Sequence, residues 1–278
     1  MELQTPVIIP PSSFKIESIE KILFVGSCFA DSIGRRFQGD LFQAAVNPYG
    51  VMYNPASILH TIQEFSKFIP DIAVITLGTN HIYIERSTGN IVDNCQKRPQ
   101  QLFEEKVLNV DECTEYLLQA VQALQEKNPA IQIIFTVSPI RYKKYGFHES
   151  QLSKATLLLA SDNVVKAQPG CSSYFPAYEI MMDFLRDYRF YSPDMIHPSE
   201  QAVDYIYEQF VQIYGSADTL DFLAAWKPLK DALHHRPFRP DSEENQRFQT
   251  ALEFKIKAFQ ERYPEAKTLF DAYKANNC

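Results

Sequence analysis

Ser27 is the residue in this sequence best placed to act as a nucleophile. It follows Gly26 and the short apolar run 22–25, which predicts a buried parallel strand. Residues 30–37 then have helical spacing, so Ser27 lies between a strand and a helix. Open α/β sheets bind ligands at this end of their strands, and the first amides of a helix attract negative charge. Because Gly-Ser is also common in ordinary turns, the serine needs partners before catalysis is indicated.

Asp194 and His197 are the candidate partners, in the spacing Asp-x-x-His directly before a predicted helix that starts at Pro198. A histidine can act as the general base of a serine when a carboxylate on its other ring nitrogen holds one tautomer. Two intervening residues let a single tight loop supply both groups. The same residues are also typical of a capped turn before a helix, so the spacing gains weight only together with Ser27.

Two further predicted strands also end in polar residues. Residues 71–77 form an apolar run that precedes Gly78, Thr79 and Asn80, and residues 131–137 precede the segment that ends at Arg141. Parallel strands joined by right-handed crossovers place their carboxyl ends on one edge, so these groups and Ser27 are expected there together. Arg141 could bind a carboxylate or phosphate of a substrate, or it could form a structural ion pair.

Strand and helix patterns alternate up to about residue 215, which predicts an α/β fold with a parallel sheet between two helix layers. Residues 44–57 are expected to be a loop, with a helix starting at Asn54-Pro55. The other expected elements are a hairpin over 82–92, helices over 111–126 (Asp111 as N-cap), 152–167 and 178–186, and a strand over 172–175. We therefore expect one domain over residues 1–215 and a helical C-terminal extension over 216–278, with charged helices at 241–262 and 265–274.

Composition excludes several classes of partner. The net charge is −7 with no block of Lys or Arg, which argues against nucleic acid and anionic membranes. The first residues lack the pattern of a signal peptide, and no apolar run reaches the length of a membrane span. The five cysteines are scattered without a Cys-x-x-Cys pair, so we expect reduced thiols in a cytoplasmic protein and neither a disulfide framework nor a metal site.

The order Ser, then Gly and Asn, then Asp-x-x-His resembles the block pattern of the SGNH (GDSL-like) hydrolases. Residues 26–30 read GSCFA, the name motif of the GSCFA family, a group that itself resembles those hydrolases. The phrases TLGT, NCQKRP, SPIR and SKA, and the run from Tyr174 to Ser199, are also similar to that family. The resemblance covers residues 5–215 and implies a flavodoxin-like three-layer α/β/α sandwich of the SGNH hydrolase type, acting without a cofactor.

Carried over position by position, the resemblance implies that Ser27 is the nucleophile, His197 the base and Asp194 its orienting partner. Cys28 is an alternative nucleophile, because a thiol is intrinsically better at neutral pH. The residue after the nucleophile in a tight turn usually faces inward, so we expect Cys28 to be a buried thiol.

The resemblance also implies an oxyanion hole built from the Ser27 amide, a second backbone amide and an Asn side chain. Asn80 matches the third block of the family pattern through Gly78-Thr79-Asn80. The second block falls on Gly50 or Asn47 in the run VNPYG.

Together these patterns predict a serine hydrolase that acts on a small-molecule or carbohydrate ester, or an O-acyltransferase in which an alcohol resolves the acyl-enzyme. The expectation of a sugar rests on fold-level analogy and on four tyrosines that could stack on one, although packing roles suit at least two of them. These are Tyr49, Tyr53, Tyr83 and Tyr142.

A second hypothesis is a non-catalytic binding module that keeps the pocket and has lost the chemistry. It is motivated by GSC in place of the usual GDS, and by Gln96, where the family often has His. A phosphoester or nucleotide enzyme is a third hypothesis, but the sequence has neither a glycine-rich phosphate loop nor an acidic metal cluster.

Overall fold

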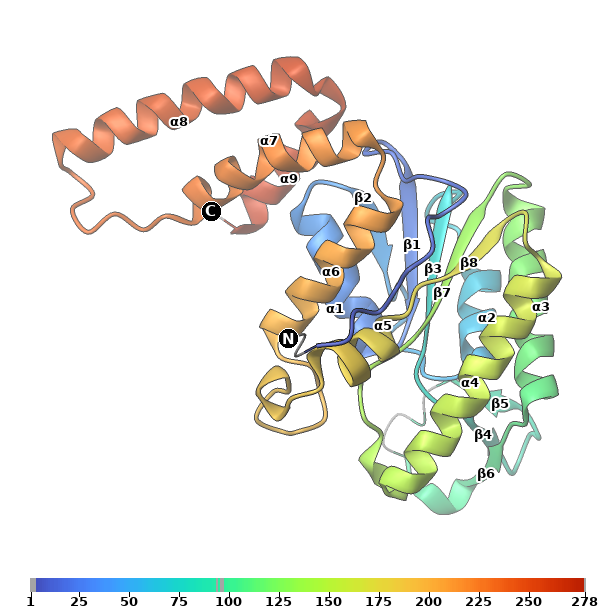
Figure 1. Ribbon diagram of the computed structural model, residues 1–278. Coiled ribbons are helices and arrows are strands. Elements are labelled where there is room, and N and C mark those ends of the chain that lie inside the picture. Colours follow the sequence, from blue (N-terminus) through green and yellow to red (C-terminus); the bar gives the residue numbers. More distant parts are fainter. Residues whose placement is uncertain (1–3, 94, 96–97, 278) are drawn as a thin grey trace.

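A five-stranded parallel sheet lies between two layers of helices in the computed structural model, which describes residues 4–93, 95 and 98–277 (Figure 1). This architecture confirms the predicted α/β class and the three layers. The strands, in spatial order, are β2 (Gln43–Val46), β1 (Lys21–Gly26), β3 (Ile72–Leu77), β7 (Gln132–Val137) and β8 (Ser172–Tyr174).

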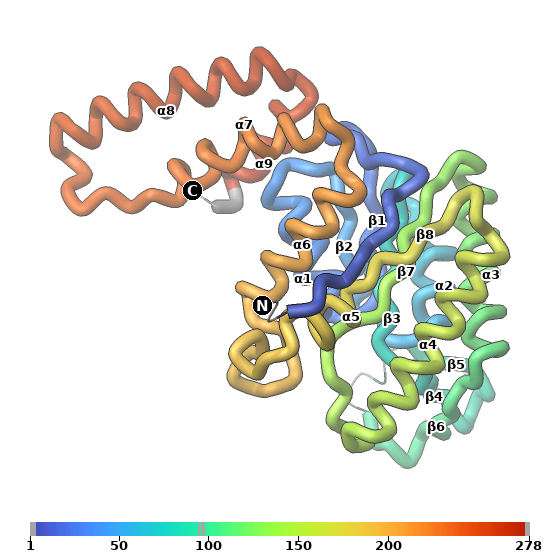
Figure 2. Tube along the Cα trace, in the orientation of Figure 1, coloured from blue at the N-terminus to red at the C-terminus, as the bar shows by residue number. Residues whose placement is uncertain are grey.

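Each face of the sheet has its own apolar core, because the central strands are buried on both sides. One face packs against α2 (Pro55–Glu64), α3 (Val110–Lys127) and α4 (Phe147–Ala167). The other packs against α1 (Cys28–Gly39), α6 (Glu200–Tyr214) and α5 (Ala177–Glu179), which continues as a π-helix over Ile180–Leu185. The N-terminal arm crosses this second face between α6 and β8 (Figure 2).

The side on which the chain adds new strands to the sheet changes between β1 and β3. From β1 the chain first adds β2 on one side, and then crosses back to add β3, β7 and β8 on the other. This order is the flavodoxin-like one, and sheets of this kind bind ligands outside the carboxyl ends of the strands at the reversal point, here β1 and β3. Ser27 directly follows β1 and Gly78 directly follows β3, so topology places both at this point.

A small antiparallel sheet follows β3 and its polar turn. It consists of β4 (His81–Glu85), β5 (Ile91–Val92) and β6 (Phe103–Val107), with β4 in the centre. The predicted hairpin is confirmed, but the third strand was not expected. Gln96, which motivated the binding-module hypothesis, lies outside the described residues.

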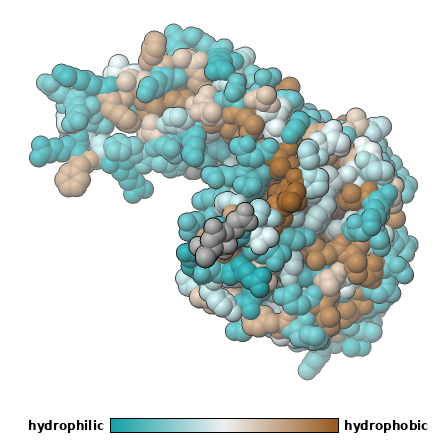
Figure 3. Space-filling view, in the orientation of Figure 1, coloured by the Kyte–Doolittle hydropathy of each residue, from teal (hydrophilic) through white to brown (hydrophobic). Residues whose placement is uncertain are grey.

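The C-terminal extension contains three helices, α7 (Ala217–His234), α8 (Glu243–Arg262) and α9 (Lys267–Asn277), which project from the sheet domain (Figure 1). They share a core of their own around Trp226, to which the sheet domain contributes Leu41. Hydrophilic residues predominate on the visible surface of this extension (Figure 3). Two contacts tie it to the end of α1: the Trp226 indole donates to the Gly39 carbonyl at 3.0 Å, and Lys230 pairs with Asp40 at 2.7 Å.

Two local predictions were wrong, and one helix was not predicted. Part of the expected loop over 44–57 is the edge strand β2, whose four residues, Gln-Ala-Ala-Val, are too few to give a clear strand pattern. The N-cap of α3 is Asn109 rather than Asp111, because Asn109 and Glu112 form a reciprocal capping box. The helix that was not predicted is α7, which is continuous although Pro228 lies within it.

Gly26 makes the turn before Ser27 possible. Its φ is +141°, and a Cβ on this residue would lie 2.0 Å from the Thr76 carbonyl oxygen. We therefore expect Gly26→Ala to lower the free energy of unfolding by about 3 kcal/mol or more, measured by denaturant titration. Gly89 has φ +71°, but a Cβ on it would have no atom within 4 Å, so Gly89→Ala is the control for backbone strain alone, at about 1 kcal/mol. Equal losses in the two variants would contradict the steric explanation.

Candidate active site

Ser27 is the N-cap residue of α1 and is 2% exposed. Its hydroxyl oxygen accepts a hydrogen bond from the Phe29 amide at 3.3 Å, and its own amide donates to the Thr76 carbonyl at 3.0 Å. The hydroxyl therefore sits at the positive end of the α1 dipole, where developing negative charge is stabilised. The predicted strand–turn–helix setting of Ser27 is confirmed.

Asn47 shapes the Ser27 turn from the loop after β2. Its side-chain carbonyl oxygen accepts from the Gly26 amide at 2.8 Å, and its side-chain NH₂ donates to Asp31 on α1 at 2.6 Å. Asn47 is buried and has a left-handed φ of +39°, which asparagine tolerates better than most residues. The Met52 amide closes the same loop onto the Gly26 carbonyl at 2.9 Å. Asn47 thus belongs to the turn, with both ends of its amide engaged inside the protein.

Asp194 and His197 form a hydrogen-bonded pair. The His197 Nδ1 lies 2.6 Å from Asp194 Oδ2, and both side chains are 45% exposed. Asp194 Oδ1 also accepts from the amides of Ile196 and His197 at 2.9 and 3.0 Å. These amides, with the His197 ring, lower the pKa of Asp194 to about 2, the His197 amide having the largest effect. One carboxylate therefore both caps the turn and holds the imidazole, so the two interpretations of Asp-x-x-His are compatible.

The loop that carries this pair is closed at its neck. Tyr191 and Pro198 form an antiparallel bridge, and the Ser192 amide donates to the His197 carbonyl at 2.8 Å. Met195 at the tip has φ +58°, an unfavourable value for a residue without special turn chemistry. Such a closed loop fixes where the imidazole is presented.

Arg141 braces the same loop from the end of β7. Its amide donates to the Ile196 carbonyl and its guanidinium to the Met195 carbonyl, both at 3.1 Å. The guanidinium also stacks over Phe147, 3.8 Å from the ring centre. Among the described residues Arg141 has no ion pair, so the structural ion pair considered from sequence is absent there, and substrate binding stays a prediction.

Ser27 and His197 make no hydrogen bond with each other in the described part of the chain. Among these residues the Ser27 hydroxyl accepts only from the Phe29 amide, and the His197 Nε2 has no partner. Apo active sites often show long catalytic contacts that shorten when substrate binds. The candidate base and its candidate orienting carboxylate are hydrogen-bonded to each other, and among the described residues neither is hydrogen-bonded to Ser27.

The other predicted oxyanion donors are engaged elsewhere. The amide of Gly50 donates to the Asn47 carbonyl at 2.9 Å, and the amide of Gly78 donates to the Tyr53 carbonyl at 2.9 Å. The Asn80 side chain donates to the Leu108 carbonyl at 2.7 Å, so it anchors the end of the small sheet. The role of these three residues toward an oxyanion stays a prediction.

Cys28 is not the buried thiol that was expected. It is the first residue of α1 and is partly exposed, whereas the preceding Ser27 is buried. Its sulfur lies 3.5 Å from the Tyr53 hydroxyl, and burial together with this contact raises the pKa of Tyr53. The backbone amide of Cys28 has no hydrogen-bond partner among the described residues. It is therefore an unoccupied donor immediately beside the Ser27 hydroxyl.

A surface hollow of about 650 Å³ begins at Cys28. It runs along α1 past Arg35 and reaches Lys230 and His234 on α7, so the C-terminal extension forms its far wall. Of the four tyrosines considered from sequence, Tyr49 and Tyr53 are exposed. Tyr83 and Tyr142 are half-buried within a cluster around Tyr145.

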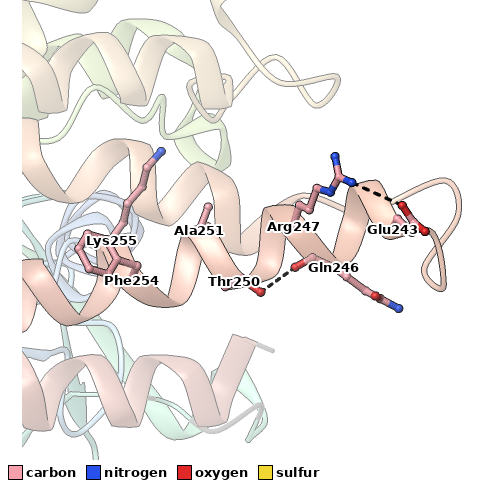
Figure 4. A pocket seen from close by; sticks show the side chains of 7 residues that line it. All are labelled: Glu243, Gln246, Arg247, Thr250, Ala251, Phe254 and Lys255. Atoms are coloured by element: carbon pink, nitrogen blue, oxygen red, sulfur yellow. Dashed lines mark hydrogen bonds and ion pairs between the residues drawn. The ribbon is translucent and has the colours of Figure 1, made fainter.

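Another hollow, of about 790 Å³, lies on one face of α8 (Figure 4). Only side chains of that helix line it, and no residue of the predicted site takes part. Within residues 4–93, 95 and 98–277, no three His, Cys, Asp or Glu side chains are grouped to hold a metal ion. No helix of the described chain is long and apolar enough to cross a membrane.

Lys154 was overlooked in the sequence, although it lies against the candidate site. It is 3% exposed, and its ammonium donates to the Gly78 carbonyl at 2.7 Å. The signal was a lysine next to the buried helical stripe Ser153, Leu157 and Ala160. Charged residues are rarely buried without a partner, so such a position merits attention.

A family model described as the GSCFA family matches residues 21–69 and 68–210 of this chain. A second model, described as the C-terminal domain of GSCFA domain proteins, matches residues 226–269. None of the curated proteins compared with the chain matches it.

Several solved structures are similar in fold. A mutant of Axe2, an acetyl-xylooligosaccharide esterase from Geobacillus, is 16% identical over 73% of this chain and 97% of its own, with a TM-score of 0.47. A GDSL-like lipase from Bacteroides thetaiotaomicron is 14% identical over 69% and 86%, with a TM-score of 0.45. A family 3 carbohydrate esterase from Clostridium thermocellum is 14% identical over 75% and 98%, with a TM-score of 0.43. At such distances the activity of this chain has to follow from its own residues.

Proposed function

This chain belongs to the GSCFA family, and we propose that it is a serine hydrolase that cleaves ester bonds. The observation that carries the proposal is the pairing of His197 with Asp194 on a loop braced from the same sheet edge at which Ser27 caps α1. A buried serine at a helix N-terminus and an imidazole held in one tautomer are the two parts that acyl transfer requires.

In the proposed reaction the Ser27 oxygen attacks the ester carbonyl carbon while His197 Nε2 takes the hydroxyl proton. Asp194 keeps the other ring nitrogen protonated and stabilises the imidazolium. The unoccupied amide of Cys28 donates to the oxyanion, supported by the dipole of α1. His197 then gives its proton to the leaving alcohol, and water, activated by the same histidine, releases the acid and restores Ser27.

The proposal requires Ser27 and His197 to come within hydrogen-bond distance when substrate binds. Ser27 can release its weak 3.3 Å contact with the Phe29 amide by rotating its side chain. The exposed loop of Asp194 and His197 can approach as one unit, because its neck is closed on itself. Loop movements on substrate binding complete many active sites.

We further propose that the hollow beside Cys28 receives the body of the ester, with a small acyl group at Ser27. Its lining is polar and includes Arg35, Lys230 and His234, which suits a hydroxyl-rich alcohol such as a sugar. The exposed Tyr53, whose hydroxyl lies 3.5 Å from the sulfur of the lining residue Cys28, could stack on a sugar face. If an alcohol replaces water in the second step, the same site is an O-acyltransferase.

The test is to treat the wild-type protein with a fluorophosphonate probe, map the modified peptide by mass spectrometry, and assay a panel of acetyl, butyryl and acetylated-sugar esters. We expect the label on Ser27 and turnover of at least one short-chain ester. A label on Cys28 would identify its thiol, and not the Ser27 hydroxyl, as the nucleophile. Absence of both labelling and turnover would overturn the proposal.

A non-catalytic binding module is the second candidate, favoured by one observation. The Ser27 amide is engaged with Thr76, and Ser27 and His197 are not bonded in the described structure. A protein that binds sugars or esters reproducibly by calorimetry, turns over none of them and does not react with the probe would be this module.

Arg141 is expected to act through the Asp194–His197 loop. Arg141→Met should lower kcat by about 10²-fold with little change in KM, because a small displacement of the base misaligns proton transfer. Arg262→Met is the matched control, since Arg262 also stacks on an aromatic ring, Tyr263 at 5.1 Å, but in the C-terminal extension. Steady-state kinetics on a cleaved ester check the prediction. A rise in KM alone would instead indicate that Arg141 binds substrate.

We also propose a cytoplasmic location, supported by the scattered and odd-numbered cysteines. The boundary between a domain over 1–215 and an extension over 216–278 is likewise proposed, supported by the separate core of α7, α8 and α9.

A further inference from the structure

Lys154 is the buried ionisable group that the reaction described above does not use. It lies on α4, is 3% exposed, and donates to a single acceptor among the described residues, the Gly78 carbonyl at 2.7 Å. None of those residues offers it a carboxylate partner. A buried ammonium without a counter-charge is unfavourable for stability, so a functional reason for its position is to be sought.

Helix α4 holds three consecutive residues of the loop after β3 through two consecutive side chains. While Lys154 contacts the Gly78 carbonyl, the Ser153 hydroxyl accepts from the Asn80 amide at 3.1 Å and lies 3.3 Å from the Thr79 hydroxyl. All five residues of this contact are buried, and the contact makes the loop after β3 rigid.

The held loop is in direct contact with the Ser27 turn. A Cβ on Gly78 would lie 3.3 Å from the Ser27 Cβ and 3.0 Å from the Tyr53 carbonyl oxygen. The amides of Gly78 and Thr79 both donate to that same Tyr53 carbonyl, at 2.9 and 2.8 Å. The peptide between Gly78 and Thr79 is therefore held at both ends, by Lys154 at its carbonyl and by Tyr53 at its amide.

We propose that Lys154 is a positioning residue for the reaction at Ser27, and that its bond to the Gly78 carbonyl holds the loop that forms the wall beside the nucleophile. This inference rests on the proposed hydrolase function. A hydrogen bond from a buried cation is stronger than one between neutral groups, and it polarises the peptide it contacts. Loss of the bond lets Gly78 and Tyr53 move, which misplaces the carbonyl carbon relative to the Ser27 oxygen.

The test compares Lys154→Met with Lys127→Met, a control at a remote site. Lys127 also donates its ammonium to backbone carbonyls, among them Phe65 at 2.7 Å, but at the far end of α2. We expect Lys154→Met to lower kcat by about 10²-fold with KM within about twofold. Lys127→Met keeps wild-type kcat even where it lowers thermal stability. Lys154→Arg, which retains a cation and N–H donors, is expected to restore part of kcat.

Hydrogen exchange separates failure of this inference from failure of the hydrolase proposal. Lys154→Met should speed exchange of the Gly78 and Thr79 amides, and Lys127→Met should not, whether or not any ester is cleaved. Unchanged exchange in Lys154→Met would overturn the positioning role. Faster exchange with wild-type kcat would overturn its link to the reaction. A wild-type protein without turnover or probe labelling would instead overturn the hydrolase proposal.

If Lys154→Met does not fold, the wild-type protein supplies the measurement. Burial lowers the pKa of Lys154 to about 7, and none of the described residues forms an ion pair with it. As the pH rises from about 6 to about 9, the ammonium becomes an amine and its bond to Gly78 weakens. Corrected for intrinsic rates, protection of the Thr79 amide should fall through pH 7. The titration of Lys154 itself is followed by the NMR shift of its Cε, and protection that stays constant across that titration would overturn the proposal.

Discussion

Ser27→Ala is expected to lower turnover of any ester cleaved by the wild-type protein by about 10⁴-fold or more, and to abolish fluorophosphonate labelling. The physical reason is that removal of the hydroxyl leaves the Asp194–His197 pair with nothing to deprotonate except water. The expected loss is in kcat, because the alanine removes one oxygen atom from a site otherwise unchanged. Stopped-assay kinetics and intact-protein mass spectrometry measure the two effects.

Folding has to be monitored in the same variant. Ser27 caps α1 by accepting from the Phe29 amide, and loss of such a cap costs about 1 kcal/mol of stability. Ser27→Gly is a useful companion, because glycine is nearly as good an N-cap as serine but equally lacks the nucleophile. Both variants should show the same kinetic loss with different thermal midpoints.

Two residues provide controls for Ser27. Ser242 is the N-cap of α8 and accepts from the Asn245 amide at 3.2 Å, so Ser242→Ala removes an equivalent capping oxygen away from the proposed site and should leave acylation unchanged. Cys28→Ala tests the thiol, and it should keep most of the activity because the proposed contribution of Cys28 is its backbone amide. If labelling persists in Ser27→Ala and disappears in Cys28→Ala, the serine is not the nucleophile.

The second large effect is expected at the base and its partner. His197→Ala should lower kcat by about 10⁴-fold or more, since no other group in the proposed site removes the Ser27 proton. Asp194→Asn should cost about 10³- to 10⁴-fold, because an amide cannot hold the imidazole in the required tautomer. Asparagine can still accept from the Ile196 and His197 amides, so the loop is expected to remain folded.

Asp187→Asn is the matched control for Asp194→Asn. Asp187 also caps a short turn, accepting from the Arg189 amide at 2.9 Å, but it contacts no histidine in the described structure. It should leave kcat unchanged. Equal losses of kcat in the two variants would show that loss of a turn cap is enough to lower kcat, and that the Asp194–His197 hydrogen bond has no role in catalysis.

The pH dependence of this pair has a defined sign. The pKa of Asp194 is lowered to about 2, so the carboxylate is charged through the whole working range and is neutralised only as the pH falls through that value. Rate–pH profiles between about pH 4 and pH 9 should therefore contain no ionisation of Asp194. Curvature near the ordinary pKa of an aspartate, absent from Asp194→Asn, would contradict the hydrogen-bond network around it.

Local spacing predicted a large part of the candidate site. Asp194 and His197 are three residues apart, so a tight turn alone brings their side chains together, and the observed 2.6 Å contact follows from it. Ser27 likewise depends on a strand, a glycine and a helix that are adjacent in sequence. The capping box of Asn109 and Glu112 was also readable as Asn-x-x-Glu, although Asp111 was preferred.

Elements without a strong local pattern were harder to predict. Strand β2 is an edge strand of four residues that pairs only with β1, so neither burial on two faces nor alternation marks it in the sequence. The third strand of the small sheet, β6, is largely charged and exposed for the same reason. Such strands owe their conformation to a neighbour rather than to their own residues.

By itself, the sequence determined the α/β class, the sheet edge that carries the polar groups, and the candidates Ser27, Asp194 and His197. It could do so because strand and turn signals are local, and because crossovers between parallel strands are right-handed. Only the tertiary structure decided that Cys28 is partly exposed, and that Gly78 and Asn80 already have their amides engaged. It also decided that Lys154 reaches the Gly78 carbonyl, 76 residues away in the chain. Whether a hydrogen-bond donor is free, or a charged side chain is buried, depends on residues that folding brings together from distant segments. The spacing of residues along the chain does not reveal these contacts.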